Sequence, residues 1–309
     1  MNFKIALLNL FLFLLLVAKA QDPVLAERLG YPTNTKFLII HADDLGVAHS
    51  QNRATVHALE NSPVNSASIM VPCPWFPEIA AYAREHPKAD LGLHLTLTSE
   101  WTNYKWGPVS AKDSVSSLLN KNGYFYATVD SLVRYAVPSE VEIELRNQIK
   151  KAYAFGIDVT HLDAHMGGAM ATPDFLRAYI KVGKEFRLPV FLPKEIGDMG
   201  ELKDNGTLDD RTVLVNHSTI GPSDYREGTD QFYRELLRDL PPGVTNLLVH
   251  LAYDDSEMRA VTTGFEDWGS AWRQADLDFF TSPECKRILK ESNIVLLQWR
   301  EIRDRIVRR

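Results

Sequence analysis

Short apolar runs recur along the chain and are separated by longer segments with helical periodicity. Residues 37–40 are apolar throughout, which is typical of a parallel strand covered on both faces, because a strand with one wet face alternates apolar and polar residues. The pattern predicts strands at residues 37–42, 65–71, 91–98, 159–164, 189–192, 212–216, 245–251 and 294–298. It predicts helices at residues 52–60, 76–85, 140–155, 173–186, 230–240 and 276–292.

The alternation of about eight such strands with helices predicts an α/β fold, because parallel strands need long crossover connections. At this spacing we expect a single irregular, TIM-like (β/α) barrel over residues 36–309 rather than an open sheet. Residues 101–130 interrupt the pattern and are rich in Trp, Tyr, Asn and Gly. We expect them to form a long connection over one face of the barrel, where such loops bind substrates.

The first residues have the layout of a secretory signal peptide. Residues 1–20 contain a positive charge, an apolar run over residues 5–17 and a small-x-small end. The run is shorter than the roughly 20 residues that a membrane-spanning helix needs. We therefore predict cleavage near Ala20, an N-terminal extension over residues 21–35, and export to the periplasm or medium without a stable membrane anchor. An uncleaved anchor is the alternative.

Composition and charge narrow the function classes. The chain is 45% hydrophobic and 24% charged, as soluble globular proteins are. Its 34 Lys and Arg against 40 Asp and Glu give a net charge of -6, so no bulk positive field attracts nucleic acid. With only two cysteines, Cys73 and Cys285, a disulfide scaffold and a multi-cysteine metal module are excluded. Export would permit a disulfide between them, and two separate buried thiols fit equally well.

Four polar clusters lie at the ends of predicted strands, where barrel enzymes collect catalytic residues. In the first, Asp43 and Asp44 come directly after the first apolar strand. Two adjacent carboxylates there are costly unless a cation or hydrogen-bond donors compensate them. One interpretation makes them the N-cap of a helix that begins near Ser50. Ser50 can cap that helix itself, which leaves both acids free for chemistry.

The second cluster gives the predicted strand at residues 91–98 one polar face. Leucines alternate there with Gly92, His94, Thr96 and Thr98, so strand geometry places these four on one side. Gly92 has no side chain, which leaves room for a ligand beside His94. A single core histidine is the alternative, and the neighbouring threonines favour a polar pocket instead.

In the third cluster, His161, Asp163 and His165 share one face of a strand by the same alternation. Two imidazoles and a carboxylate at a strand end are typical of a metal site, in which the carboxylate accepts the second ring proton of a metal-bound histidine. Asp163 would then orient a histidine ligand. A surface polar patch is the alternative.

The fourth cluster places His250 after an apolar strand and a few residues before Asp254 and Asp255. Three roles are open for His250: a core residue, a metal ligand or a proton donor. A nearby carboxylate would hold the imidazole protonated, so either acid would make the donor role available.

In order and position these clusters resemble the YdjC/ChbG-type carbohydrate deacetylases, relatives of the NodB-type polysaccharide deacetylases. The resemblance extends over residues 36–300. It is carried by Ala42-Asp43-Asp44-Leu45-Gly46, Asn52-Arg53, Ser66-Ala67-Ser68-Ile69-Met70-Val71, Gly92-Leu93-His94-Leu95-Thr96-Leu97-Thr98, His161-Leu162-Asp163-Ala164-His165 and Gly243-Val244-Thr245 leading to His250.

The resemblance implies a barrel of the glycoside hydrolase/deacetylase superfamily type. It also implies an enzyme that hydrolyses the acetyl group from an N-acetylated carbohydrate. One divalent metal ion, Zn²⁺ or Mg²⁺, would be held by Asp44, His94 and His165. Relatives often carry an arginine near residues 191–192, where the nearest cation in this chain is Lys194. An arginine that orients the base is therefore expected to be missing or replaced.

The same resemblance implies roles for the other polar residues. Asp43 would be the general base that takes a proton from the attacking water, and His250 would protonate the leaving amine. His161 and Asp163 would support the ligands or contact the substrate. The expected partner is an acetylated oligosaccharide or polysaccharide, with no nucleic acid. The oligomeric state is left open, a homodimer included.

Two other functions stay open from the residues alone. A metal-water site does not specify the acyl group, so a metal-dependent hydrolase of another amide or ester is one of them. The other is a non-catalytic exported glycan-binding protein, which would gain nothing from an unpaired carboxylate base. Aromatic residues favour a sugar, because aromatic rings pack on pyranose faces. In the long connection these are Trp101, Tyr104, Trp106, Tyr124 and Tyr126.

Overall fold

The computed structural model describes residues 25–198 and 206–309. The predicted signal peptide at residues 1–20 and its cleavage point lie outside the described residues, as does the first part of the predicted extension at 21–35. Within the described ranges, no helix combines the length and the apolar character that crossing a bilayer requires.

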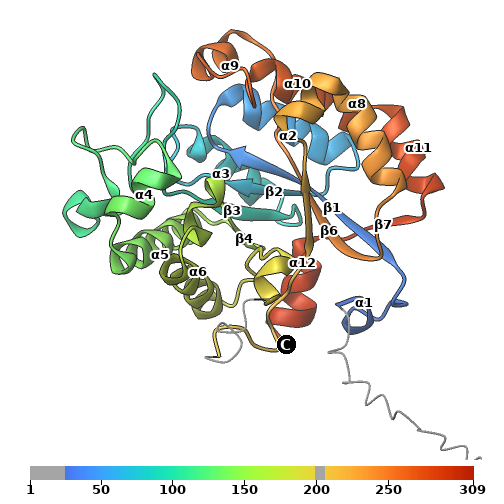
Figure 1. The fold of residues 1–309 in the computed structure, drawn as a ribbon, viewed down its shortest axis with the longest axis horizontal. Coiled ribbons are helices and arrows are strands. Elements are labelled where there is room, and N and C mark those ends of the chain that lie inside the picture. The colour runs from blue at the N-terminus through green and yellow to red at the C-terminus, as the bar shows by residue number, and fades with distance from the viewer. Residues whose placement is uncertain (1–24, 199–205) are drawn as a thin grey trace, which may run out of the picture.

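Parallel strands form the centre of the molecule and helices surround them (Figure 1). In the described part of the chain the strands are β1 (Lys36–Leu45), β2 (Ser66–Ile69), β3 (Leu91–Leu95), β4 (Leu162–Ala164), β5 (Asn216–Thr219), β6 (Gly243–Val249) and β7 (Ile294–Leu296). The α-helices there are α1 (Leu25–Arg28), α2 (His49–Asn61), α3 (Phe76–Glu85), α4 (Val129–Tyr135), α5 (Pro138–Ala154), α6 (Pro173–Phe186), α8 (Pro222–Arg238), α9 (Ser256–Val261), α10 (Ser270–Thr281), α11 (Pro283–Glu291) and α12 (Trp299–Ile302). Helices α3 and α6 have the bounds that the sequence predicts.

Strand β1 is the centre of the sheet, whose ladder order is β4-β3-β2-β1-β6-β5 with β7 also paired to β1. One edge of β1 pairs with β6, and the other edge is shared by β7 near its start and β2 near its end. Every β1 residue after Lys36 is buried. Leu38 and Ile40 pack in the main core, while Phe37 and Ile39 pack in a second cluster. The predicted parallel strand with two covered faces is therefore confirmed.

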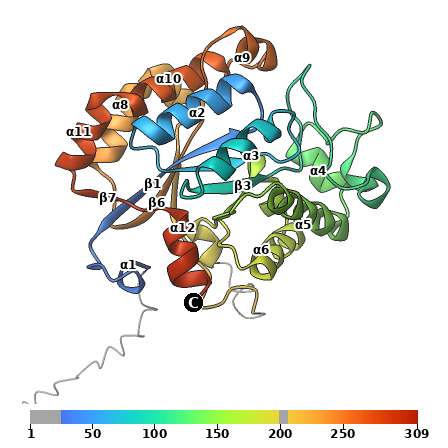
Figure 2. The same ribbon diagram turned by 180° about the vertical axis from the view of Figure 1, so that it is seen from behind.

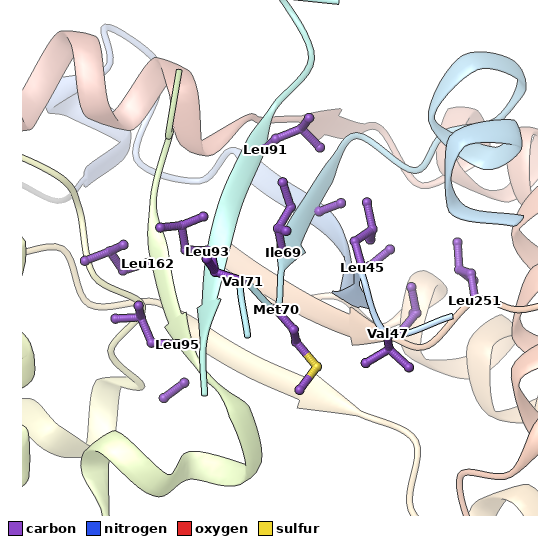
Figure 3. Packing of buried hydrophobic residues seen from close by; sticks show 14 of the residues in the cluster. Leu45, Val47, Ile69, Met70, Val71, Leu91, Leu93, Leu95, Leu162 and Leu251 are labelled. Atoms are coloured by element: carbon purple, nitrogen blue, oxygen red, sulfur yellow. The ribbon is translucent and has the colours of Figure 1, made fainter. Parts of the chain in front are cut away.

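Two groups of helices cover the sheet. In one group α10 packs against both α2 and α8, and α11 packs against α8, as both views show (Figure 1, Figure 2). In the other group α5 packs against α6. Figure 3 shows the core from close by, with Ile69 of β2, Leu93 of β3 and Leu162 of β4 together in one apolar cluster. Burial of these side chains positions the strand ends that carry the polar clusters.

The sheet does not close into a complete ring of regular strands. Between β4 and β5 the chain makes only isolated bridges, Leu162 with Val190 and Pro193 with Val215. The predicted strands at residues 189–192 and 212–216 therefore do not form as such, and β5 begins at Asn216. Prolines lack the N–H that a ladder needs, and Pro193 lies where the ladder breaks. The fold is thus an α/β fold with a parallel, incompletely closed barrel sheet.

Two helix boundaries differ from the prediction for physical reasons. The predicted helix at residues 276–292 is two helices, α10 and α11, because Pro283 cannot continue α10 and instead begins α11. Helix α2 is not capped by Ser50: it begins at His49, and the carboxylate of Glu257 accepts from the backbone N–H of His49 and Ser50 at 3.3 and 2.7 Å. A carboxylate distant in sequence takes the capping role.

Cys73 and Cys285 are both free and buried, so the structure has two separate thiols rather than a disulfide. Burial raises the pKa of each thiol, to about 12 for Cys285. Both groups are therefore neutral and unreactive at neutral pH.

The space in front of Gly92 is filled by protein rather than left for a ligand. A Cβ built on Gly92 would overlap the ring of His161, which is fully buried. We expect Gly92→Ala to lower the free energy of unfolding by about 1–3 kcal/mol, because a packed aromatic ring must move. Urea denaturation measures this change. The control is Gly168→Ala, whose nearest neighbour is the flexible Leu132 Cδ2 at 3.2 Å; equal losses in both variants would contradict this packing.

Candidate active site

Four strands end at one pocket of about 1120 Å³. Asp43 and Asp44 belong to the end of β1, His94 lies near the end of β3, and His165 and His250 directly follow β4 and β6. Because all the strands are parallel, their carboxyl ends meet at the same side of the sheet. The polar clusters predicted from the sequence therefore meet in space.

A break in strand regularity brings Asp43 and Asp44 to the same pocket. Neighbouring residues of a regular strand point to opposite faces, but the register of β1 against β2 shifts between Ala42 and Leu45. Asp44 has a φ of 61°, a left-handed conformation that Asp and Asn tolerate better than most side chains. The irregularity thus places two acids where alternation alone would place one.

Asp44, His94 and His165 form a compact set of donor atoms. Asp44 Oδ1 lies 3.4 Å from His94 Nε2 and 3.4 Å from His165 Nδ1. This buried oxygen has no hydrogen-bond partner in the described structure. The ligand atoms of a tetrahedral ion with bonds of about 2.0–2.1 Å are about 3.3 Å apart. The set therefore fits a divalent cation bound by one carboxylate and two imidazoles.

Each imidazole of this set has a carboxylate at its other ring nitrogen. His94 Nδ1 lies 2.8 Å from Asp163 Oδ1, and His165 Nε2 lies 3.0 Å from Glu100 Oε2. The other oxygen of Asp163 lies 2.8 Å from His41 Nε2. Carboxylates placed in this way fix the tautomer and the orientation of a ligand histidine. Asp163 thus lies where an orienting residue would, and Glu100 occupies the matching place for His165.

Neighbouring charges shift the pKa values of Asp163 and His165 more than burial does. Burial would raise the pKa of Asp163, but His94 and His41 lower it well below its ordinary value. Burial would lower the pKa of His165, but Glu100 and Asp44 raise it to about 10. The carboxylate-rich surroundings therefore strongly favour a positive charge at this position.

Arg273 of α10 binds the free side of Asp44. One nitrogen of the guanidinium donates to Asp44 Oδ2 at 2.9 Å and another donates to Gln51 Oε1 at 2.9 Å. Burial would raise the pKa of Asp44, but Arg273, followed by His165, lowers it well below its ordinary value. Asp44 is therefore held ionised, with Oδ1 pointing at the two imidazoles.

The sequence pattern does not single out Arg273. The expected position for an arginine was near residues 191–192, and the predicted helix began at residue 276, whereas α10 begins at Ser270. An arginine buried on a helix face has no motif spacing to mark it. Its burial, with 3% of Arg273 exposed, marks its role, because buried charges are almost always paired.

Asp43 and His250 form a second pair in the pocket. Asp43 Oδ1 lies 3.3 Å from His250 Nε2, and Asp43 Oδ2 lies 3.5 Å from His94 Nε2. Burial and the charge of Asp44 raise the pKa of Asp43 well above its ordinary value. Burial and Arg273 lower the pKa of His250 to about 3, so its ring is neutral.

The acids that follow His250 in sequence do not hold it protonated. Asp254 pairs with Arg259 at 2.8 Å, and Asp255 caps α9 by accepting from the backbone N–H of Met258 at 3.1 Å. The expectation that either acid charges His250 is therefore wrong, because both are bound at the start of α9. Its carboxylate neighbour is Asp43 instead.

His161 lies behind the pocket rather than in its wall. Its ring stacks on Trp299 with centroids 5.3 Å apart and meets the edge of the His41 ring at 4.9 Å. Burial lowers the pKa of His161 well below its ordinary value, so the ring is neutral. His161 therefore supports His41, which contacts Asp163, and does not itself face the pocket.

Most aromatic residues of the 101–130 connection serve packing rather than the pocket. Trp101 lines the pocket. Trp106 is buried and donates its indole N–H to the Thr98 carbonyl at 2.8 Å, and Tyr104 donates to the Val47 carbonyl at 2.7 Å. Of the five aromatic residues that the sequence singles out in this segment, Trp101 is the one that lines the pocket.

Asp276 lies beneath His250 and links the pocket to the core. It accepts from Tyr233 Oη at 2.8 Å and from the backbone N–H of His250 at 3.1 Å. Burial raises the pKa of Asp276 to about 7 even though both donors oppose the shift. Between about pH 4 and pH 7 the Asp276 carboxyl group is therefore protonated in the folded protein and ionised in the unfolded chain. Because the unfolded chain binds fewer protons in this range, the free energy of unfolding falls as the pH rises from about 4 to about 7.

Replacement of Asp276 by asparagine is expected to remove this pH dependence. Relative to the wild type, the free energy of unfolding of Asp276→Asn should rise by about 3 kcal/mol between pH 5 and pH 8. Asparagine stays neutral and still offers an oxygen to the His250 N–H. Urea denaturation of both proteins at the two pH values measures the difference, and a difference that does not change with pH would contradict the raised pKa.

Comparison with known proteins now gives the family. A family model described as YdjC-like protein matches residues 37–291, which include every site residue described above. The chain belongs to the YdjC-like family. A carbohydrate deacetylase from Thermus thermophilus is 33% identical over 288 residues, covering 91% of this chain and 98% of that protein. A carbohydrate deacetylase from Brevibacillus brevis is 32% identical over 271 residues, covering 86% and 99%.

A solved structure has the same fold as this YdjC-like chain. A candidate cellobiose-phosphate cleavage protein from Enterococcus faecalis matches with a TM-score of 0.73 at 22% identity, covering 86% of this chain and 98% of that chain. At this identity the match shows the fold alone. The resemblance predicted from the strand-end motifs is confirmed, and with it the prediction that the chain is an enzyme of this family.

Proposed function

We propose that this YdjC-like protein is a divalent-metal-dependent deacetylase that hydrolyses the acetyl group of an N-acetylated carbohydrate. The observation that carries the proposal is the Asp44–His94–His165 donor set beside the buried carboxylate of Asp43 in one pocket. Relatives named carbohydrate deacetylase support the substrate class. Metal-dependent hydrolysis needs a bound cation and a general base within hydrogen-bond range of the same water, and the adjacent Asp44 and Asp43 could supply a ligand and that base.

The metal would be held by Asp44 Oδ1, His94 Nε2 and His165 Nδ1. One carboxylate and two imidazoles suit Zn²⁺, and Mg²⁺ would need more oxygen ligands from water. When bound, such an ion polarises the acetyl carbonyl, lowers the pKa of water and favours the ionised form of nearby carboxyl groups. Arg273 would keep Asp44 ionised from the opposite side.

Asp43 and His250 would move the protons. Asp43 takes a proton from water as its oxygen attacks the acetyl carbon. The bond from that carbon to nitrogen then breaks, and the leaving nitrogen needs one proton. Because His250 is neutral before the reaction, it delivers the proton that Asp43 removed, passed over the 3.3 Å between Oδ1 and Nε2. The products are acetate and a free amino sugar.

Export belongs to the same proposal. Residues 1–20 have the layout of a signal peptide, so the enzyme would meet glycans outside the cytoplasm. N-terminal sequencing of the protein purified from its native source tests this: a mature chain that starts near Gln21 agrees, and a chain that retains residues 1–20 contradicts it.

Acetate release from a panel of substrates tests the proposed function. Metal-free protein, with and without added Zn²⁺ or Mg²⁺, is incubated with N-acetylated chitooligosaccharides, O-acetylated glycans and a simple acetylated amide. We expect metal-dependent acetate release from the N-acetylated glycans, with one free amine for each acetate. Release from the amide alone would favour a different amidohydrolase, and no release from any glycan would refute the proposal.

A further inference from the structure

Trp268 is an exposed tryptophan of the pocket wall that is held in a strained conformation. It lies between α9 and α10 with a φ of 55°, a region that is costly for a bulky side chain, and 39% of it is exposed. At the next residue, Gly269, any side chain would overlap the carbonyl of Phe265. The turn therefore fixes the orientation of Trp268. Such strain at a pocket wall points to function rather than to core packing.

A stack of aromatic rings supports Trp268. Its ring lies 5.1 Å from that of Trp272 at an angle of 21°, and Trp272 in turn lies 4.3 Å from the ring of Tyr225 at 7°. Trp272 is fully buried, so the stack is anchored between α8 and α10. One face of the Trp268 indole is covered in this way, and the residue lines the pocket. The uncovered part of a rigid aromatic surface is thus presented to a ligand.

Arg273 ties this surface to the proposed metal site. Its Nε donates to the carbonyl of Trp268 at 2.8 Å, and the same guanidinium donates to Asp44 Oδ2 at 2.9 Å. It also lies 5.6 Å over the ring of Trp101, which lines the pocket too. One buried group therefore sets the position of Trp268 relative to Asp44. Trp268 and Asp44 line the same pocket, so a ligand on the indole would share that pocket with the group at Asp44.

We infer that Trp268 is a stacking platform for a second sugar ring, adjacent to the ring that carries the acetyl group, so that the pocket selects oligosaccharides over monosaccharides. This inference rests on the proposed function. The axial C–H groups of a pyranose form an apolar face, and a flat aromatic ring is the side chain that packs best on it. A pocket of about 1120 Å³ has room for more than one ring, since it exceeds the upper end of the range for small-molecule sites, about 1,000 Å³.

Binding without turnover tests the platform. The protein is the full mature chain with Asp43→Asn, loaded with Zn²⁺, and the probes are N-acetylglucosamine and N,N′,N″-triacetylchitotriose in isothermal titration calorimetry. Adding Trp268→Ala should raise the Kd for the trisaccharide about tenfold and leave that for the monosaccharide unchanged. Trp268→Phe should retain most of the trisaccharide affinity. The matched control is Trp75→Ala, a tryptophan of similar exposure outside the pocket wall, which should change neither Kd.

The outcomes separate this inference from the proposed function. Equal trisaccharide affinity with and without Trp268 overturns the platform, and so does a parent protein that does not bind the trisaccharide. A loss of affinity for both sugars would indicate a general structural role and also overturn it. If Trp268-dependent binding is found but no glycan releases acetate from the wild type, the platform stands and the proposed function fails. If acetate is released and Trp268→Ala leaves the trisaccharide Kd and KM unchanged, the proposed function stands and the platform fails.

Discussion

Replacing Asp43 with asparagine is expected to lower kcat for acetate release by about 10²–10⁴-fold, the usual contribution of a positioned general base. Asparagine has the shape of aspartate but cannot accept the proton of the attacking water. Metal binding should be retained, because the Asp44–His94–His165 set is untouched. KM should change little. Steady-state acetate release and the metal content of the purified variant measure these effects.

The matched control for this variant is Asp254→Asn. Asp254 is also an aspartate near a strand end, but it pairs with Arg259 at 2.8 Å and does not line the pocket. Its replacement should leave kcat unchanged. A kcat of wild-type size in Asp43→Asn would remove Asp43 as the base, and a low metal content in that variant would show that Asp43 is a ligand instead.

Replacing Asp44 with asparagine is expected to weaken metal binding more than about 100-fold. Mutation of a residue that only hydrogen-bonds to a metal ligand already lowers metal affinity about 10–100-fold, and Asp44 would be a ligand itself. Acetate release should fall to the metal-free level. Asparagine tolerates the φ of 61° at this position, so the variant tests the charge of Asp44 without adding backbone strain. Zn²⁺ affinity by competition with a chromophoric chelator and metal content by mass spectrometry give the result.

Folding of Asp44→Asn has to be checked separately, because Arg273 loses its charged partner. Removing one member of a buried ion pair leaves the charge of the other uncompensated. In Asp44→Asn the uncompensated charge is that of Arg273, which donates to Asp44 Oδ2 in the wild type. Arg273→Met supplies the comparison, since it disturbs the same pair and leaves Asp44 Oδ1 in place. If Arg273→Met loses Zn²⁺ as completely as Asp44→Asn, Asp44 is needed for local structure rather than as a ligand.

The apolar pattern of the sequence predicts the individual strands and helices better than it predicts whether the sheet closes into a barrel. The runs that became β1 and β3 and the helical periodicities of α3 and α6 depend on local burial, which a sequence records directly. The gap between β4 and β5 depends on which hydrogen bonds the chain can complete around Pro193. Those hydrogen bonds depend on how the neighbouring strands align in space, which the local sequence does not record. The apolar run at 189–192 therefore predicts a strand, although the chain there makes only isolated bridges.

The residues of the candidate site likewise fall into those that the sequence predicts and those that it does not. Asp44, His94 and His165 lie at or just after strand ends, which an apolar run marks for Asp44 and strand alternation marks for His94 and His165, and so can be predicted. Arg273 and Glu100 reach the site from a helix and a loop, where no spacing rule marks them. The meeting of Asp43 and His250 depends on the irregular end of β1, which strand alternation does not reveal.

A metal titration shows directly whether the Asp44–His94–His165 set is a catalytic metal site. Metal-free enzyme is mixed with increasing Zn²⁺, and acetate release from N-acetylated chitooligosaccharide is measured at each step. We expect activity to rise in proportion to added Zn²⁺ and to level off at one equivalent per chain, as a single Asp44–His94–His165 site requires. Full activity without metal, or no activity at any amount of Zn²⁺ or Mg²⁺, would contradict it.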